Sequence, residues 1–378
     1  MKEKVVPMLK FFEVDNFRGF DAPVSLDFKC GSYAFNEGIV SHGLVKNAII
    51  YGKNGIGKSA LGIAIFDIVS HLTDKNRIKD TYLKPYCNCN TKRDEATFKY
   101  VFDFDGTEVV YSYAKDNARD LRWERVSVGG ETIVDYNYSA GGTKFVKAEV
   151  VGSLNIDLPD NKLSIVKYIV RNTPTGTVPY LSRMTDFCDG MLWYRSLSDG
   201  NDYAGFLTGS ETLDEGIFSH SQGDLAEFEQ LLRENGVEYS LSFAESSGQH
   251  RIMVSFANGT TVPFDAVAST GTQTLRLFYY WKSVAFTRTT LLFIDEFDAF
   301  LHFEAAASLT RTLNAMPRTQ VVLTSHNTYL MRNDLTRPDC CYIMTKNRVS
   351  SLANATDRVL REGHNLGKLY VNGAFTEG

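Results

Sequence analysis

The sequence has 378 residues, of which 43% are hydrophobic and 22% charged, as in an ordinary globular protein of one large domain or two smaller ones. No run approaches the ~18 consecutive apolar residues of a membrane-spanning helix, and the charged N-terminus lacks the apolar core of a signal peptide. The formal net charge of −5 disfavours a protein whose whole surface coats nucleic acid. We therefore expect a cytoplasmic protein without membrane contact.

Two alternating apolar runs open the chain, and residues 10–17 and 24–28 predict a pair of antiparallel strands. The loop between them carries Arg18. An arginine in a tight loop beside a nucleotide site can contact a phosphate or stack on the base. A solvated loop arginine is the alternative.

Residues 52–59 fit the pattern G-x-x-x-x-G-K-[ST] without a mismatch. The apolar residues 48–51 before them predict a buried strand, and residues 60–72 predict a largely buried helix. Strand, glycine loop and helix form a phosphate cradle, in which Lys58 would reach the β- and γ-phosphates and Ser59 would hold Mg²⁺. A glycine-rich turn that matches by chance is the alternative, and its flanks argue against it. The predicted nucleotide-binding residues here are Asn54, Gly55, Gly57, Lys58, Ser59 and Ala60.

The sequence pattern in the middle of the chain predicts β-hairpins. Residues 98–104 and 109–113 alternate around Asp105-Gly106, and residues 123–128 and 132–136 repeat the pattern. We expect an antiparallel layer there, followed by helices at 162–171 and 224–235 and a hairpin over 238–256. Residues 172–222 give no clear pattern.

A helix is predicted from residue 269 to about 286, and Ser269, Gly271 and Thr272 lie in its first turn. Such a turn is a second anion-binding site, although an ordinary helix cap looks similar. Because the chain already has its own phosphate cradle, the second turn is best explained as completing the site of another subunit.

Two further apolar strands end in polar residues. The strand over 290–296 ends in Asp295 and Glu296, and the strand over 320–326 ends in His326, with a helix predicted over 299–313 between them. Asp295 suits Mg²⁺ and Glu296 suits a general base, although both could be simple helix-cap acids. His326 is a candidate γ-phosphate sensor or an ordinary turn residue. Alternating strands and helices predict a parallel sheet.

Together these motifs resemble the head of ABC-type ATPases, and the match spans nearly the whole chain. The corresponding segments are Walker A at 52–59, the signature at 269–273, Walker B at 293–296, the D-loop aspartate Asp298 and the switch histidine His326. Residues 16–20 resemble the N-terminal loop of RecF- and SMC-like heads. Residues 295–302 and 365–375 resemble the OLD-like group of AAA family ATPases.

The resemblance implies an α/β fold, an ABC-type P-loop NTPase head with a mixed or parallel core sheet, an antiparallel β layer and a helical lobe. One ATPase domain would span 1–378, with 1–75 and 260–378 as the nucleotide-binding core and 90–260 as inserted hairpin and helical lobes. ABC heads usually carry a glutamine between Walker A and the signature. No glutamine lies between Ser59 and Gln222, so the residue that replaces it is open.

The resemblance also implies a homodimer that closes around two ATP molecules with Mg²⁺, and it leaves a higher assembly open. We expect a regulatory ATPase that hydrolyses ATP and gates a separate effector, a nuclease or toxin, in anti-phage defence. The chain after His326 is too short for the Toprim nuclease of OLD proteins. A RecF-like repair ATPase acting on DNA is the alternative, and DNA or RNA stays open as a partner. A transporter subunit fits least, because strand-rich insertions separate Walker A from the signature.

Overall fold

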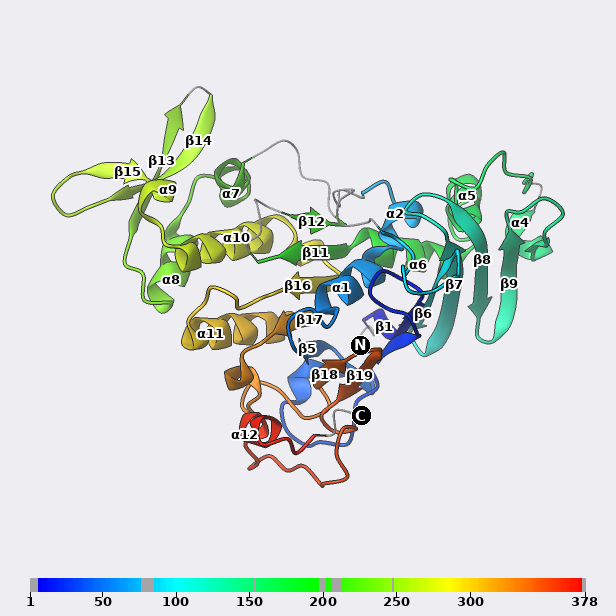
Figure 1. Cartoon of the computed structure of the whole chain (residues 1–378). Coiled ribbons are helices and arrows are strands. Elements are labelled where there is room, and N and C mark those ends of the chain that lie inside the picture. Colours follow the sequence, from blue (N-terminus) through cyan, green and yellow to red (C-terminus); the bar gives the residue numbers. More distant parts are fainter. Residues whose placement is uncertain are drawn as a thin grey trace.

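The computed structural model describes residues 6–375 apart from 76–84, 153, 197–201, 206–211 and 247. Two seven-stranded sheets dominate this part of the chain (Figure 1). They lie next to each other, since Leu9 of one exchanges backbone hydrogen bonds with the Gln320 side chain of the other. Within the described residues, no helix has both the length and the apolar character needed to cross a membrane.

The central sheet is mostly parallel and carries the phosphate loop. Its order is β12 (Tyr203–Ala204), β11 (Met191–Arg195), β16 (Leu291–Asp295), β17 (Gln320–Ser325), β5 (Asn47–Tyr51), β18 (Cys341–Thr345) and β19 (Arg348–Ser351). The strands from β11 to β18 run parallel, and the edge strands β12 and β19 are antiparallel. The carboxyl ends of the parallel strands therefore meet at one edge, where open α/β sheets bind ligands.

The second sheet is antiparallel throughout. Its order is β10 (Lys144–Val146), β9 (Glu131–Asn137), β8 (Leu121–Val128), β7 (Thr107–Lys115), β6 (Ala96–Phe104), β1 (Met8–Asp15) and β2 (Val24–Asp27). The β6–β7 turn confirms the hairpin expected at Asp105-Gly106, since both residues have positive φ, 57° and 84°, as a tight two-residue hairpin turn requires.

Helices cover both faces of the central sheet. The α-helices are α1 (Lys58–Phe66), α2 (Val69–Leu72), α4 (Ala148–Val151), α5 (Ile165–Asn172), α6 (Pro179–Asp189), α7 (Leu213–Ser221), α8 (Ala226–Glu234), α9 (Phe264–Val267), α10 (Thr270–Val284), α11 (Phe303–Asn314) and α12 (Leu366–Val371). The 3-10 helices are η1 (Glu37–Ile39), η2 (Phe286–Arg288) and η3 (Thr328–Leu330). The small sheets contain β3 (Val40–Ser41) and β4 (Leu44–Val45), and β13 (Ser240–Ser246), β14 (Gln249–Ser255) and β15 (Thr261–Pro263).

Alternate residues of β5 enter two separate cores. Ala48 and Ile50 pack on the side of α1 and the antiparallel sheet, whereas Ile49 and Tyr51 pack on the side of α10 and α11. Because both faces are covered, all five residues of β5 are buried. The three-layer arrangement of an ABC-type head, predicted from the motifs, is the arrangement observed.

Two expectations need correction. The helix predicted over 299–313 begins only at Phe303, because Ala299 and Leu301 form turns that bond back to Glu296 and Asp298. Strand β11 lies within the predicted insertion at 90–260, yet it pairs with β16 in the central sheet. The predicted nucleotide-binding core therefore extends beyond 1–75 and 260–378, since a strand from the middle of the chain, with its first four residues buried, belongs to the same sheet.

Candidate nucleotide-binding site

The phosphate loop runs from β5 to α1, as the sequence pattern predicts. Gly55 and Gly57 have positive φ, 76° and 112°, a backbone conformation that side chains disfavour. A Cβ at Gly57 would also lie only 2.8 Å from the Phe20 ring, so the loop after β1 packs directly on the glycine. The N-terminus of α1 faces the same space and adds its partial positive charge.

Lys58 lies at the centre of this loop and is almost fully buried. Its ammonium donates to the backbone carbonyls of Gly52 at 2.8 Å and Lys53 at 3.2 Å, and to His326 Nε2 at 2.8 Å. Burial lowers the pKa of Lys58, while Asp295 and Glu296 oppose that shift. Partial burial and the nearby Lys58 ammonium lower the pKa of His326. These shifts favour a neutral His326 ring, whose Nε2 accepts a hydrogen bond from the Lys58 ammonium.

Asp295 and Glu296 end β16 at the same sheet edge. Asp295 is fully buried, and this burial raises its pKa, against the opposing effects of Ser59, Arg195 and Thr324. The Thr324 hydroxyl donates to Asp295 Oδ1 at 2.8 Å and accepts the Glu296 backbone N–H at 2.8 Å. Glu296 has a φ of 51°, which is uncommon outside glycine and turns its side chain away from the strand direction.

One pocket of about 450 Å³ collects most of the predicted site residues, and its size suits a small-molecule ligand. Its lining residues are Arg18, Gly19, Asn54, Gly55, Gly57, Lys58, Ser59, Ala60, Ile63, Trp193, Arg195, Asp295, Glu296 and His326. Among the described residues, Asp295 Oδ2 is a buried oxygen that accepts no hydrogen bond. A carboxylate oxygen with spare acceptor capacity near the Ser59 hydroxyl fits a magnesium site.

The remaining predicted residues lie outside the lining of this pocket. Ser269 caps α10 by accepting the Thr272 N–H at 3.2 Å, and the hydroxyls of Ser269 and Thr272 lie 2.9 Å apart. Gly271 packs against its own chain, since a Cβ there would lie 2.8 Å from the Phe300 carbonyl oxygen. Asp298 accepts a hydrogen bond from Ser325 Oγ at 2.8 Å, and burial raises its pKa.

Sequence reasoning missed two residues that contact the predicted site. Thr324 connects the Asp295 carboxylate with the backbone N–H of Glu296, and the apolar run of β17 gave no signal for its role. Arg195 ends β11 and lies beside Ser59, Asp295 and Glu296, although residues 172–222 gave no recognisable element. A buried run of Met, Leu, Trp and Tyr before Arg195 is the signal that could have identified the strand.

A phosphate loop beside two strand-end carboxylates, on a parallel sheet flanked by an antiparallel one, is the arrangement that the motifs predict for an ABC-type head fold. Residues 197–332 match the family model described as "AAA domain, putative AbiEii toxin, Type IV TA system". This segment contains the residues predicted as the signature, Walker B and the switch histidine. Among curated proteins, none matches the sequence.

Three solved structures are similar over most of their length. The SMC head domain from Thermotoga maritima is 13% identical, with a TM-score of 0.42, covering 90% of this chain and 97% of that one. An SmcHead bound to the C-winged helix domain of ScpA is 13% identical, with a TM-score of 0.44 and coverage of 90% and 96%. An Smc head bound to the C-terminal domain of ScpA, derived from Pyrococcus furiosus, is 12% identical, with a TM-score of 0.42 and coverage of 92% and 97%.

Proposed function

We propose that this protein binds ATP with Mg²⁺ in the pocket of the phosphate loop and hydrolyses it. The observation that carries the proposal is the meeting of the Lys58 ammonium with Asp295 and Glu296 in one pocket. Ser59 and Asp295 would hold Mg²⁺, which neutralises phosphate charge when bound. Lys58 would exchange its loop carbonyls for phosphate oxygens, which are stronger acceptors because they are charged.

Glu296 is the group that we assign as general base. Its side chain is 41% exposed, so water can reach the carboxylate, whereas Asp295 beside it is fully buried. A base that accepts the proton of the attacking water would assist in-line attack on the γ-phosphate. His326 lies beside Lys58 and would sense the same phosphate.

The signature turn at α10 would serve a second copy of the chain. Ser269 and Thr270 are exposed at the helix N-terminus and do not line the pocket of their own chain. An exposed helix N-terminus offers backbone N–H groups to an anion. We therefore propose a homodimer in which each ATP touches the phosphate loop of one protomer and the signature of the other.

The biological role that we propose is a regulatory switch for a separate effector, a nuclease or toxin in anti-phage defence. The description of the matching family refers to a toxin–antitoxin system, and this supports the proposal. ATP binding would close the dimer and hydrolysis would release it, so the nucleotide state would determine whether the effector is held.

Glu296→Gln tests the proposal, because the amide keeps the size of the side chain but cannot accept the proton. We expect ATP binding to persist and turnover to fall by ~10²-fold or more, the usual scale for a lost general base. Phosphate release and calorimetric ATP binding measure the two effects. Glu304→Gln, an exposed acid in the first turn of α11, is the matched control and should change neither. Normal turnover in Glu296→Gln would contradict the assignment of the base.

A further inference from the structure

Arg195 holds a position that the mechanism above leaves unused. It ends β11 directly beside the last residue of β16, since the parallel register pairs Arg195 with Asp295. Both side chains therefore leave the sheet at its ligand-binding edge. The guanidinium lies in the lining of the same pocket as Lys58, and its side chain is 21% exposed.

The Arg195 guanidinium contacts three groups of the predicted site. Arg195 Nη2 lies 3.2 Å from Ser59 Oγ and 3.1 Å from Glu296 Oε1, and Nε lies 3.3 Å from Asp295 Oδ2. Ser59 and Asp295 are the oxygens that would hold Mg²⁺, and Glu296 is the proposed base. One side chain thus contacts all three groups.

A guanidinium at this place cannot act as a magnesium ligand, because arginine has five N–H donors and no lone pair to offer. It instead supplies positive charge where a metal ion would supply it. The pocket lining holds three cations, Arg18, Lys58 and Arg195, against the two carboxylates Asp295 and Glu296. Without Arg195 this surplus of positive charge would be lost, and the pocket would attract the phosphates of ATP less strongly.

We propose that Arg195 is a positioning residue that supplies positive charge beside Ser59 and Asp295, where Mg²⁺ would supply it, and that exchanges these two groups for phosphate oxygens when Mg²⁺ and ATP bind. The inference rests on the proposed function and adds a residue to it. Phosphate is the natural second partner, since guanidinium and phosphate match in charge and in fork geometry. The same exchange frees Glu296, so the base becomes available only in the loaded site.

A purely structural ion pair is the competing explanation, in which Arg195 only holds the end of β11 beside β16. The two explanations differ in how ATP affinity depends on Mg²⁺. If Arg195 substitutes for the metal charge, its removal weakens ATP binding much more without Mg²⁺ than with it. With Mg²⁺ present, the variant loses one contact to phosphate. This loss is partly offset, because the variant has no Arg195 to compete with Mg²⁺ for Ser59 and Asp295. A structural ion pair would leave the dependence on Mg²⁺ unchanged.

The experiment measures the ATP dissociation constant of the whole chain with Mg²⁺ and with excess chelator, in wild type and in Arg195→Gln. We expect the ratio of the two constants, chelator over Mg²⁺, to rise about 10-fold or more in the variant. Arg18→Gln is the matched control, because Arg18 lines the same pocket and has no contact with the two carboxylates among those described. It should weaken binding under both conditions and leave the ratio near the wild-type value.

An unchanged ratio in Arg195→Gln overturns the inference, as does loss of ATP binding in the presence of Mg²⁺ while the variant remains folded. Failure of wild type to bind ATP under either condition contradicts the proposed function instead. Arg195→Met keeps the apolar stem without the charge and should raise the ratio in the same way. Glu296→Gln removes one carboxylate and should lower the ratio, which tests the charge balance without a change at Arg195.

Discussion

At the residue scale, Lys58 shows how the site is prepared for an anion. Its ammonium donates to two loop carbonyls and to the ring of His326, so its buried N–H donors have partners within the chain. All three acceptors are neutral when His326 is neutral, and burial weakens the preference of Lys58 for its charged form. A phosphate group that replaces these acceptors would restore the preference of Lys58 for its charged form, because phosphate is negatively charged.

Lys58→Ala should therefore abolish ATP binding, because no other ammonium lies at the centre of the described loop. We expect the dissociation constant to rise at least ~100-fold, the scale of a lost charge-assisted contact in a closed site. Isothermal calorimetry measures this change. Lys53→Ala is the control in the same loop, since Lys53 is exposed and takes part through its backbone carbonyl. Binding of ATP to Lys58→Ala as tightly as to wild type would contradict the phosphate-loop assignment.

The residues that belong to local motifs could be predicted from the sequence, and those defined by tertiary contacts could not. The glycine pattern after β5 places Lys58 and Ser59 at the start of α1, and the apolar run of β16 places Asp295 and Glu296 at its end. Arg195 could not be placed, because its role depends on β11 lying beside β16, and neither strand specifies its neighbour.

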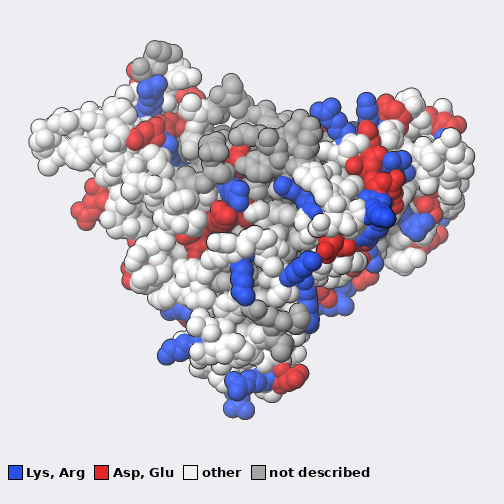
Figure 2. Space-filling view, viewed as in Figure 1, with Lys and Arg blue, Asp and Glu red and all other residues white. Residues whose placement is uncertain are grey.

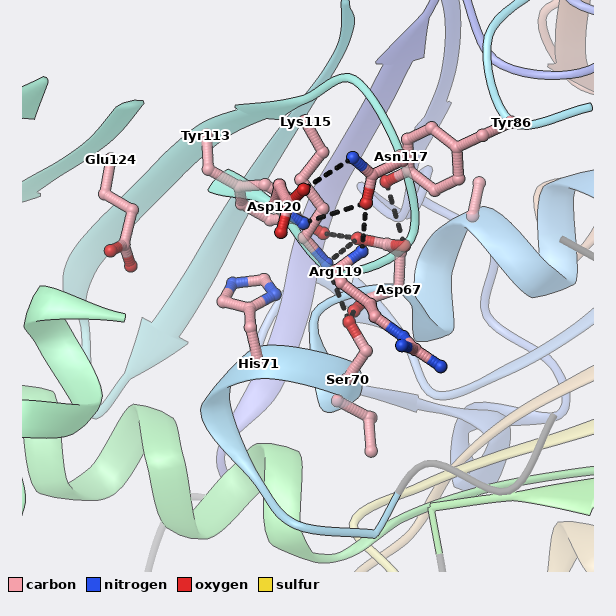
Figure 3. Close-up of polar contacts among 12 residues, drawn as sticks. Asp67, Ser70, His71, Tyr86, Tyr113, Lys115, Asn117, Arg119, Asp120 and Glu124 are labelled. Atoms are coloured by element: carbon pink, nitrogen blue, oxygen red, sulfur yellow. Dashed lines mark hydrogen bonds and ion pairs between the residues drawn. The ribbon is translucent and has the colours of Figure 1, made fainter. Parts of the chain in front are cut away.

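At the element scale, the phosphate-loop helix is joined to the antiparallel sheet by a buried polar cluster (Figure 3). The helix predicted over 60–72 breaks into α1 and α2, and Asp67 lies at the break. Asp67 accepts hydrogen bonds from Tyr86 at 3.0 Å and Tyr113 at 2.9 Å, and forms an ion pair of 2.8 Å with Lys115. Lys115 also donates to Ser70 Oγ at 2.7 Å.

Asp67→Asn should destabilise the fold strongly, since it leaves the Lys115 cation buried without its counter-ion. Both side chains of the pair are almost fully buried, and burial already lowers the pKa of Lys115. We expect the free energy of unfolding to fall by ~3–5 kcal/mol, as for other broken buried pairs. Urea unfolding measures it. Asp74→Asn removes an exposed partner of Lys167 and should cost no more than ~1 kcal/mol.

The double variant Asp67→Asn, Lys115→Met distinguishes the effect of the buried charges on stability from the effect of packing in the cluster. Removing both charges should recover part of the stability that Asp67→Asn loses, because no unpaired cation then remains. If the double variant is less stable than Asp67→Asn, the packing of Lys115 and its hydrogen bond to Ser70 would outweigh the cost of its unpaired charge.

The elements themselves differed in how well the sequence indicated them. Hairpin β6–β7 alternates clearly over most of its length, because one face of each strand is more deeply buried than the other. Strand β11 is buried on both faces, so it has no alternation, and its five residues are too few to separate strand from helix. The helix α6 before it, with Pro179 at its start and Gly190 after its end, carries the usual boundary signals.

At the scale of the whole molecule, positive and negative side chains are interspersed on the face shown in Figure 2. This mixture agrees with the net charge of −5 and with a surface on which no single sign dominates that face. A protein partner for the proposed dimer fits such a face, whereas a nucleic-acid track would concentrate Lys and Arg along one groove.

A test of the proposed dimer needs a substitution in the signature turn that affects only the ATP site of the partner chain. Gly271 is a poor choice, since any side chain there would meet the Phe300 carbonyl of its own chain. Thr270 is exposed in the first turn of α10 and is better suited. In Thr270→Glu, the carboxylate favours the helix N-terminus of its own chain but repels a γ-phosphate presented by a partner. The monomer should therefore fold normally, with a melting temperature close to that of wild type.

Mixing Thr270→Glu with Lys58→Ala tests whether the sites are shared. Each variant alone should lack ATPase activity, since both sites of its homodimer contain the defect. In a mixed dimer with shared sites, both defects fall in one site and the other is intact. We expect mixing to recover up to about a quarter of wild-type activity, since about half of random dimers are mixed. Full activity of Thr270→Glu alone, or a mixture as inactive as its parents, would contradict independent sites shared between protomers.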